Sequence, residues 1–279
     1  MLLEKKQLEK IKTLIHDYSG ILLERVSSRR IDEKILSQMK KHNISRIDDY
    51  CSMLAANTIS NSIMDDLLAE LTVNESYYFR NPGQFDYIIE QFLPSLFESR
   101  GVKNPVRIWS AGCARGEETY SIAMVAQYFI DKVPGCSFFI NAGDINSKNL
   151  VFARKGEYSK RSLRNHIDRY EKMLGIRLGN RDDKGSCCVD SRLQSLVNFK
   201  KLNLKKIQNL KSFAGSDIIF CRNVLIYFDE QFRIELVNEF LKYLSPGGLL
   251  LLGESECIPK QCSGFELISY KGSYAYRKE

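Results

Sequence analysis

Residues 107–121 constrain the fold of this chain more than any other stretch. They begin in an apolar segment, 105–111, that predicts a buried strand. Small residues with Gly112 and Gly116 follow, and from Glu118 onward apolar residues recur at helical spacing. α/β proteins hold nucleotide-like ligands with such a strand, glycine-containing turn and helix, because the backbone can approach the ligand closely there.

The glycine spacing in this loop argues against two common ligands. It matches neither the G-x-G-x-x-G of dinucleotide sites nor the G-x-x-x-x-G-K-[ST] of phosphate loops. Glu117 and Glu118 stand where a phosphate would otherwise bind, which disfavours an anionic ligand. A ligand with a cation, an amine and hydroxyl groups suits two carboxylates. S-adenosylmethionine (SAM) carries these groups, so we expect SAM at this loop.

The composition is that of an ordinary globular protein, with 44% hydrophobic and 27% charged residues among 279. No apolar run approaches the length of a membrane span, and the N-terminus lacks the apolar region of a secretory signal. We therefore expect a cytoplasmic protein. The formal net charge of +7 fits nucleic acid, an acidic membrane surface or an acidic protein, and does not decide among them.

The cysteines and histidines indicate neither a disulfide framework nor a metal site. The eight cysteines are scattered, mostly among apolar or small residues, where a thiol behaves as a small hydrophobic group. Cys187 and Cys188 are adjacent but belong to no C-x-x-C motif, so we expect them to be reduced and inert. His16, His42 and His166 show no ligand spacing, so we expect no metal.

The chain divides into three parts. Residues 1–72 carry only helical patterns, with a stop at Ser19-Gly20, and predict a small helical bundle. Residues 73–104 form a linker, and in residues 105–279 strands alternate with helices, which predicts an α/β fold with a parallel sheet. Residues 157–200 are too long and polar for one crossover and predict an inserted subdomain with short strands. We expect strands at 105–111, 138–143, 216–221 and 248–252, helices at 117–131, 147–155 and 229–244, and a C-terminal antiparallel hairpin from Phe265 to Arg277.

Two segments before the predicted sheet each allow two interpretations. The basic run from Arg25 to Lys41 is either a solvated helix face or a docking surface for an acidic partner. The three aromatic residues at 77–79 are either a hinge that packs against both neighbouring domains or a lid that lines a pocket. The residues alone do not decide either case.

Polar residues follow the predicted strands at the sheet edge where ligands bind in α/β proteins. Asp144 ends the second strand and is placed to accept hydrogen bonds from ribose hydroxyl groups. The alternative is that Asp144 caps the helix that begins near Ser147. Further residues at this edge are Arg222, Asn223, Tyr227 and the pair Asn203-Leu204.

The chain resembles the chemotaxis receptor methyltransferases, the CheR family, over nearly its whole length, and the run from Cys221 to Asp229 is the most specific part. The resemblance implies a helical N-terminal domain and a Rossmann-like SAM-dependent methyltransferase domain with an inserted β-subdomain. It also implies transfer of a methyl group from SAM to glutamate side chains of chemoreceptors, which gives methyl esters. The segments that carry it are Asn74–Arg80, Trp109–Ser121, Gly143–Asn146, Phe220–Asp229 and Ser245–Glu256.

The same resemblance implies the residues of the site and the partner. Arg80 and Tyr227 would lie nearest the chemistry, and the partner would be the cytoplasmic helices of chemoreceptors, reached through the basic run Arg25–Lys41. We expect no nucleic acid, no membrane insertion, and a monomer. The residues implied to contact the cofactor are Asn74, Ser76, Arg80, Glu118, Asp144, Asn203, Leu204, Arg222 and Asn223.

The chain departs from the family pattern at several positions. Ser76 stands where members usually have threonine, and Asn146 where they usually have aspartate, but both keep an oxygen. Arg115 brings a cation into the cofactor loop, and we expect it to point outward or to pair with Glu117.

Two other functions stay open. One is a SAM-dependent methyltransferase that acts on RNA or a small molecule and uses the basic helices for phosphate. The other is a catalytically idle SAM-binding module that docks on signalling proteins, against which the retained Arg80 and Tyr227 argue.

Overall fold

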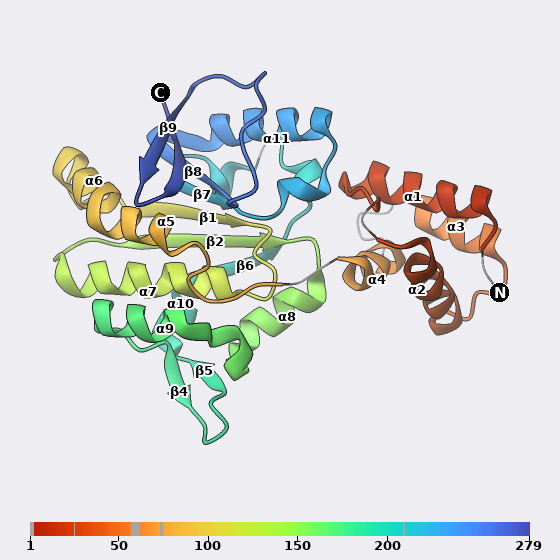
Figure 1. The fold of residues 1–279 in the computed structure, drawn as a ribbon, viewed down its shortest axis with the longest axis horizontal. Coiled ribbons are helices and arrows are strands. Elements are labelled where there is room, and N and C mark those ends of the chain that lie inside the picture. Colours follow the sequence, from red (N-terminus) through yellow and green to blue (C-terminus); the bar gives the residue numbers. More distant parts are fainter. Residues whose placement is uncertain (1–2, 25, 57–61, 73–74, 209) are drawn as a thin grey trace.

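The computed structural model describes residues 3–24, 26–56, 62–72, 75–208 and 210–279. A twisted sheet lies at its centre with helices on both faces, and a bundle of helices lies beside the sheet (Figure 1). This architecture confirms the predicted α/β class with an N-terminal helical bundle.

The large sheet has the strand order β6-β2-β1-β7-β8-β10-β9. The strands from β6 to β8 are parallel, and β10 runs antiparallel to both of its neighbours, as the predicted C-terminal hairpin requires. The chain builds β2 and β6 on one side of β1 and then crosses to β7 on the other. Ligands bind at such a switch point, beyond the carboxyl ends of the strands. The strands are β1 (Val106–Ala111), β2 (Phe138–Asp144), β6 (Val197–Lys201), β7 (Ser216–Cys221), β8 (Leu244–Leu252), β9 (Phe265–Tyr270) and β10 (Ser273–Lys278).

Alternate residues of the strands face two different cores, as the two-residue period of a strand requires. Ile218 and Phe220 pack with helices α5 to α9, whereas Ile219 and Cys221 pack with α11 and the N-terminal bundle. Among the helices of the described ranges, none has the length and apolar character that crossing a bilayer requires. The helices around the sheet are α5 (Pro82–Tyr87), the π-helical turn η1 (Ile88–Phe92), α6 (Leu93–Arg100), α7 (Glu117–Lys132), α8 (Ser147–Lys155) and α11 (Glu230–Tyr243), with 3-10 turns η2 (Leu204–Lys206), η3 (Lys211–Phe213) and η4 (Leu225–Tyr227).

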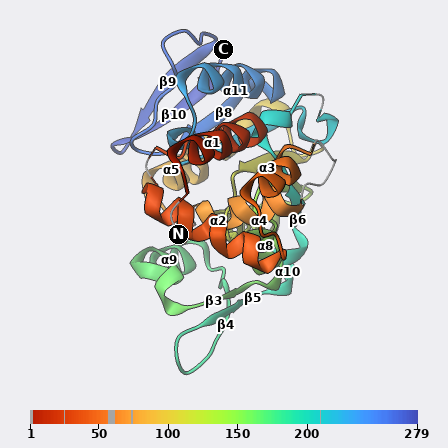
Figure 2. The same cartoon turned by 90° about the vertical axis from the view of Figure 1, so that its right-hand side faces the viewer.

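The N-terminal bundle shares its core with one face of the sheet instead of standing apart. Gly20, with a φ of +75°, ends the first helix as predicted, and the chain then runs beside the loop that follows β7. There Ile21 forms a bridge with Phe228, and the Leu22 N–H donates to the Tyr227 carbonyl at 2.8 Å. Figure 2 shows the bundle in front of the sheet. Its helices are α1 (Lys5–Ser19), α2 (Ser28–Lys41), α3 (Ile47–Ala55) and α4 (Ser62–Leu71).

Asp229 joins the bundle to α11, and its replacement tests this junction. Its carboxylate caps α11 by accepting the Phe232 N–H at 2.7 Å and lies 2.6 Å from His16 Nε2. Burial raises the pKa of Asp229, but the Phe232 N–H and His16 outweigh burial and hold the pKa below its ordinary 3.8.

Asp229→Ala should lower the free energy of unfolding by about 0.5–2 kcal/mol at pH 7, the usual value of a helix cap. Because the folded-state pKa is depressed, the stabilisation is present above the ordinary pKa and is lost as the pH falls through the folded value. Urea unfolding at pH 7 and pH 3 measures this. The same difference between variant and wild type at both pH values would contradict it.

The inserted segment differs from the prediction in two ways. It contains β3 (Glu157–Tyr158), β4 (Gly179–Arg181), β5 (Cys187–Val189) and α10 (Ser191–Ser195), but also the long helix α9 (Lys160–Leu174). The backbone of α9 breaks at Arg164, which has a φ of +42°. The many charges after this break concealed the helical spacing of the buried residues Ile167, Tyr170 and Leu174. The last expected residues, 197–200, belong to β6 of the large sheet, so the separate small sheet ends at Val189.

Candidate active site

A cavity lies at the carboxyl ends of the parallel strands, at the switch point between β1 and β7. Its wall comes from the loops after β1, β2, β6 and β7, from the segment before α5, and from Ser19 and Ile21 at the end of α1. Asn74 lies outside the described residues. The other predicted site residues all line this one cavity: Ser76, Arg80, Glu118, Asp144, Asn203, Leu204, Arg222, Asn223 and Tyr227.

The loop after β1 has its shape because of Gly112 and Gly116, both with positive φ. A Cβ on Gly112 would lie 2.6 Å from Val224 Cγ2, so a larger residue would collide with the loop after β7. The N–H groups of Gly112 and Cys113 both donate to the Gly143 carbonyl, at 2.8 and 2.9 Å. The two glycines thus let the loop after β1 pack closely against the end of β2 and the loop after β7.

Asp144 combines a structural role with a place on the cavity wall. One carboxylate oxygen accepts the N–H of Ala114 in the loop after β1, and the other accepts the N–H of Asn146, both at 2.8 Å. Burial raises the pKa of Asp144, and these two N–H groups oppose the rise. The side chain that caps α8 is Asn146, so the alternative interpretation of Asp144 as that cap is wrong. The Asn149 side chain also hydrogen-bonds this carboxylate, and a carboxylate can accept about four hydrogen bonds, so capacity remains for a ligand hydroxyl group.

Arg222, which is buried, and Glu118, which is partly buried, form an ion pair on the cavity wall. Arg222 Nη1 lies 3.3 Å from Glu118 Oε2, and the Ser110 hydroxyl donates to Oε1 at 2.8 Å. Burial raises the pKa of Glu118, and the Arg222 charge opposes the rise. The second guanidinium nitrogen of Arg222 donates to the Arg80 carbonyl. Arg222 therefore connects the carboxylate at the start of α7 to the segment before α5.

We call residues 75–80, which precede α5, the strap. Its three aromatic residues do not behave alike, and the two buried ones pack only in the core on the α5 to α9 side of the sheet, so the hinge that packs against both domains is wrong for them. Tyr77 lines the cavity, whereas Tyr78 and Phe79 are fully buried. The Phe79 ring stacks on Tyr170 of α9 with centroids 3.8 Å apart. The hypothesis of a lid is wrong for Tyr78 and Phe79, because they anchor the strap in the core.

Comparison with known proteins identifies the chain. The model of the CheR methyltransferase SAM-binding domain matches residues 74–273. A chemotaxis protein methyltransferase of Borreliella burgdorferi is 34% identical over 91% of this chain and 89% of that protein. Chemotaxis protein methyltransferase 2 of Vibrio cholerae is 30% identical over 96% of this chain and 91% of that protein. The Escherichia coli chemotaxis protein methyltransferase is 30% identical over 88% and 82%. This chain belongs to the CheR methyltransferase family.

As a CheR family member, the chain is a SAM-dependent methyltransferase, and its cavity fits SAM chemically. The carboxylates of Glu118 and Asp144 suit an amine and hydroxyl groups. Asn223 Oδ1 is buried and has no hydrogen-bond partner among the residues that the structure describes, so it is an acceptor that a bound ligand can satisfy. Within the described residues no cluster of three histidine, cysteine or acidic side chains could hold a metal ion.

The departures of this chain from the CheR pattern leave the cavity intact. Arg115 stacks its guanidinium 3.6 Å from the centroid of the Phe152 ring and does not line the cavity, which confirms the outward orientation.

Asn203 also has a structural role, because its amide donates to the Tyr18 carbonyl at 2.7 Å and its oxygen accepts the Lys205 N–H at 3.0 Å.

Glu256 organises this CheR site and was not among the predicted site residues. Its carboxylate accepts the N–H groups of Asn223 at 2.6 Å, Gly253 at 2.7 Å and Ile226 at 3.1 Å. Glu256 thereby fixes the loop that carries Asn223 and Tyr227. The available signal was an acidic residue just beyond the carboxyl end of β8, at the ligand-binding edge of the sheet.

Proposed function

We propose that this protein transfers a methyl group from SAM to glutamate carboxylates of chemoreceptors in the cytoplasm, forming methyl esters. The supporting observation is that Arg80 and Tyr227 lie on the same cavity wall as the carboxylates that suit SAM. Relatives that share nearly the whole chain are named chemotaxis protein methyltransferases. Transfer of label from methyl-labelled SAM to receptor fragments, with RNA as the competing acceptor, tests the proposal.

The cofactor contacts follow from the places of the residues. Asp144 would accept hydrogen bonds from the ribose hydroxyl groups of SAM. Glu118 and Asn223 would accept hydrogen bonds from other donor groups of SAM, and Ser76 and Leu204 would line the wall beside it. SAM supplies an electrophilic methyl carbon on a sulfonium. Asn74, which the resemblance also implicates, lies outside the described residues.

The reaction needs orientation more than proton transfer. A glutamate carboxylate has an ordinary pKa of about 4.3, so it is already ionised at neutral pH and requires no base. Both charges diminish as the methyl group moves, so water would stabilise the reactants more than the transition state. Holding the three reacting atoms in line can contribute roughly 7–11 kcal/mol. Apolar side chains of Ile21, Ile226 and Phe228 line the cavity and limit water there.

Tyr227→Phe separates two roles of this side chain. If the Tyr227 hydroxyl aligns the attacking carboxylate, turnover should fall by about 10²-fold, because small misplacements of reacting groups are costly. If the ring alone shields the methyl carbon, turnover should fall only modestly. We expect the larger loss, with SAM affinity within about threefold of wild type. Single-turnover rates at saturating SAM give the answer, and a rate equal to wild type would remove Tyr227 from the chemistry.

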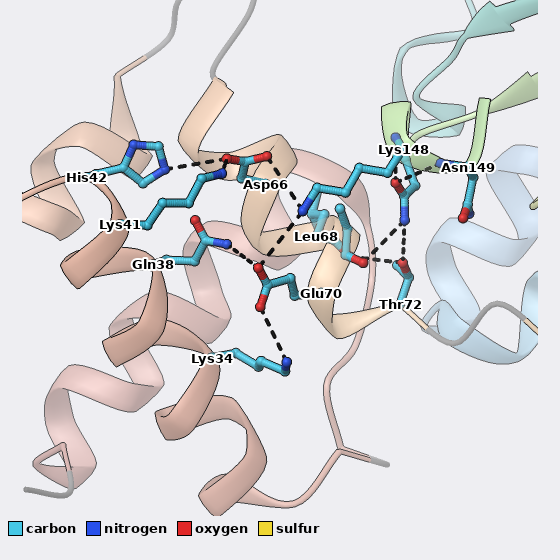
Figure 3. A network of polar contacts seen from close by, with 12 residues as sticks. Lys34, Gln38, Lys41, His42, Asp66, Leu68, Glu70, Thr72, Lys148 and Asn149 are labelled. Atoms are coloured by element: carbon cyan, nitrogen blue, oxygen red, sulfur yellow. Dashed lines mark hydrogen bonds and ion pairs between the residues drawn. The ribbon is translucent and has the colours of Figure 1, made fainter. Parts of the chain in front are cut away.

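The basic run on α2 is partly neutralised inside the molecule. Figure 3 shows Lys34 and Lys41 turned toward α4, where Lys34 Nζ lies 3.4 Å from Glu70 and Lys41 pairs with Asp66. Arg29 pairs with Glu33 of its own helix at 3.1 Å, and both Arg29 and Arg30 are exposed. Arg25 lies outside the described residues. We propose that Arg29 and Arg30 contact an acidic chemoreceptor surface.

Replacing Arg29 and Arg30 with glutamine should lower kcat/KM for receptor fragments by about three- to tenfold at low ionic strength. Salt should reduce the difference, because it screens exposed charges. SAM affinity should stay unchanged, since neither residue lines the cavity. Lys34→Gln with Lys41→Gln is the matched control, which removes equal charge but breaks pairs with α4. Equal rate losses in both double variants would contradict the docking role.

A further inference from the structure

Helix α7 is hydrogen-bonded to the strap near the N-terminal end of the helix. The Phe79 N–H donates to the Ser121 hydroxyl at 2.9 Å, and that hydroxyl donates to the Glu117 carbonyl at 2.8 Å. The Tyr78 N–H donates to the Ser162 carbonyl of α9 at 3.1 Å. Two consecutive N–H groups of the strap are thus satisfied by α7 and α9, which meet at Glu117.

The Glu117 carboxyl group lies at this meeting point. Glu117 is only 1% exposed, and its Oε1 accepts the Ser162 hydroxyl at 3.1 Å. The Ser76 hydroxyl of the strap lies close enough to affect its ionisation, as does Arg115. Its Oε2 is buried and has no hydrogen-bond partner within the described residues. Glu117 does not line the cavity, although its neighbour Glu118 does.

A buried carboxyl group without an ion pair is costly, so its presence needs a reason. Burial raises the pKa of Glu117, and its own N–H, the two serine hydroxyl groups and the more distant Arg115 oppose the rise. None of these neighbours forms an ion pair with Glu117, so the group contributes hydrogen bonds more than charge. The reaction requires no base, so Glu117 has no catalytic task of its own.

We propose that Glu117 is a positioning residue that holds the strap, and so sets the places of Ser76 and Arg80 on the cavity wall. The other end of the strap is fixed separately, because Arg222 donates to the Arg80 carbonyl. Loss of the Glu117 side chain would leave the backbone contacts of Arg80, Phe79 and Tyr78 in place but would remove the contacts of the carboxyl group with Ser162 and Ser76, so the part of the strap that carries Ser76 would shift. The effect should therefore appear in SAM affinity and in the rate of transfer together.

The test compares Glu117→Ala, Glu117→Gln and Glu171→Ala. Glutamine keeps an oxygen acceptor for Ser162 at the same distance, so it should restore what alanine loses. Glu171 is a partly buried carboxylate of α9 that accepts the Leu178 N–H at 2.9 Å, away from the strap and the cavity. Its alanine variant controls for a loss of stability in the same part of the molecule.

Glu117→Ala should weaken SAM binding by about three- to tenfold, the scale of one net hydrogen bond. It should also lower kcat at saturating SAM by about tenfold or more, because the Arg80 side chain shifts with the strap although its carbonyl stays bound to Arg222. Glu117→Gln should stay within about threefold of wild type in both quantities, and Glu171→Ala should match wild type in both.

Calorimetry with SAM and transfer rates with receptor fragments provide the two measurements, and thermal unfolding shows that each variant is folded. The proposal is overturned if folded Glu117→Ala keeps wild-type affinity and kcat, if glutamine fails to restore them, or if Glu171→Ala loses as much. The inference rests on the proposed function for its rate measurement only. If wild-type protein methylates no receptor fragment, the proposed function fails, and SAM affinity still decides the role of Glu117.

Discussion

Arg80→Ala should lower the rate of methyl transfer by about 10²-fold or more in folded protein saturated with SAM. Arg80 lines the cavity, and its Nη1 donates to the Glu75 carbonyl at 3.3 Å, which directs the side chain along the strap. Because the acceptor carboxylate carries no proton at neutral pH, the guanidinium acts by orienting it through charge-assisted hydrogen bonds. SAM affinity should fall as well, since the resemblance also places this arginine against the cofactor.

Arg164→Ala is the matched control for Arg80→Ala. Both guanidinium groups lie over the Tyr77 ring, at 3.7 Å for Arg164 and 5.5 Å for Arg80, but only Arg80 lines the cavity. The control removes an arginine from the same ring and should keep the wild-type rate. Single-turnover transfer to receptor fragments measures both variants. A wild-type rate for Arg80→Ala at saturating SAM would show that this residue does not orient the acceptor.

Asp144→Ala should weaken SAM binding by about 1.5–3 kcal/mol, the value of hydrogen bonds to a charged group. The loss corresponds to roughly 10- to 150-fold in Kd. Part of it would come from release of the Ala114 N–H, which Asp144 also binds. Asp144→Asn separates the two parts, because the amide oxygen still accepts one N–H while the charge is gone.

We expect Asp144→Asn to lie between wild type and Asp144→Ala in calorimetric SAM affinity. Unchanged SAM affinity in folded Asp144→Ala would leave this carboxylate with only its structural bonds to Ala114 and Asn146.

The order of strands and helices could be predicted from the sequence because local periodicity determines it. β1, β2 and β7 begin and end within one residue of the prediction, since each is an apolar run with clear ends. α9 could not be predicted because it breaks at Arg164 and because many charged residues surround the apolar residues Ile167, Tyr170 and Leu174. β8 begins at Leu244, earlier than expected. The prediction placed its start at 248 because Pro246, Gly247 and Gly248 are residues typical of a turn.

Sheet topology alone predicts cavity residues where they stand at the end of a strand or directly after it, whereas Ser76 and Arg80 were implied by the family resemblance. Asp144, Arg222 and Asn223 are of this kind, and the sheet brings them together. Ser19 and Ile21 could not be found, because they reach the cavity only through the packing of α1 against the loop after β7. The same limit hid Glu256, because two of its three partners, Asn223 and Ile226, lie 33 and 30 residues earlier in the chain.

The central claim is that this protein esterifies glutamate side chains of chemoreceptors, and one labelling experiment tests it most directly. Purified protein is incubated with methyl-labelled SAM and cytoplasmic receptor fragments, and the fragments are then treated with base. A methyl ester releases its label as methanol under base, whereas methyl groups on nitrogen or carbon remain. Fragments in which the acceptor glutamates are alanine serve as the control. We expect label in the wild-type fragments, released as methanol, and none in the alanine fragments. Label that resists base, or that passes to RNA and not to the fragments, would contradict the account.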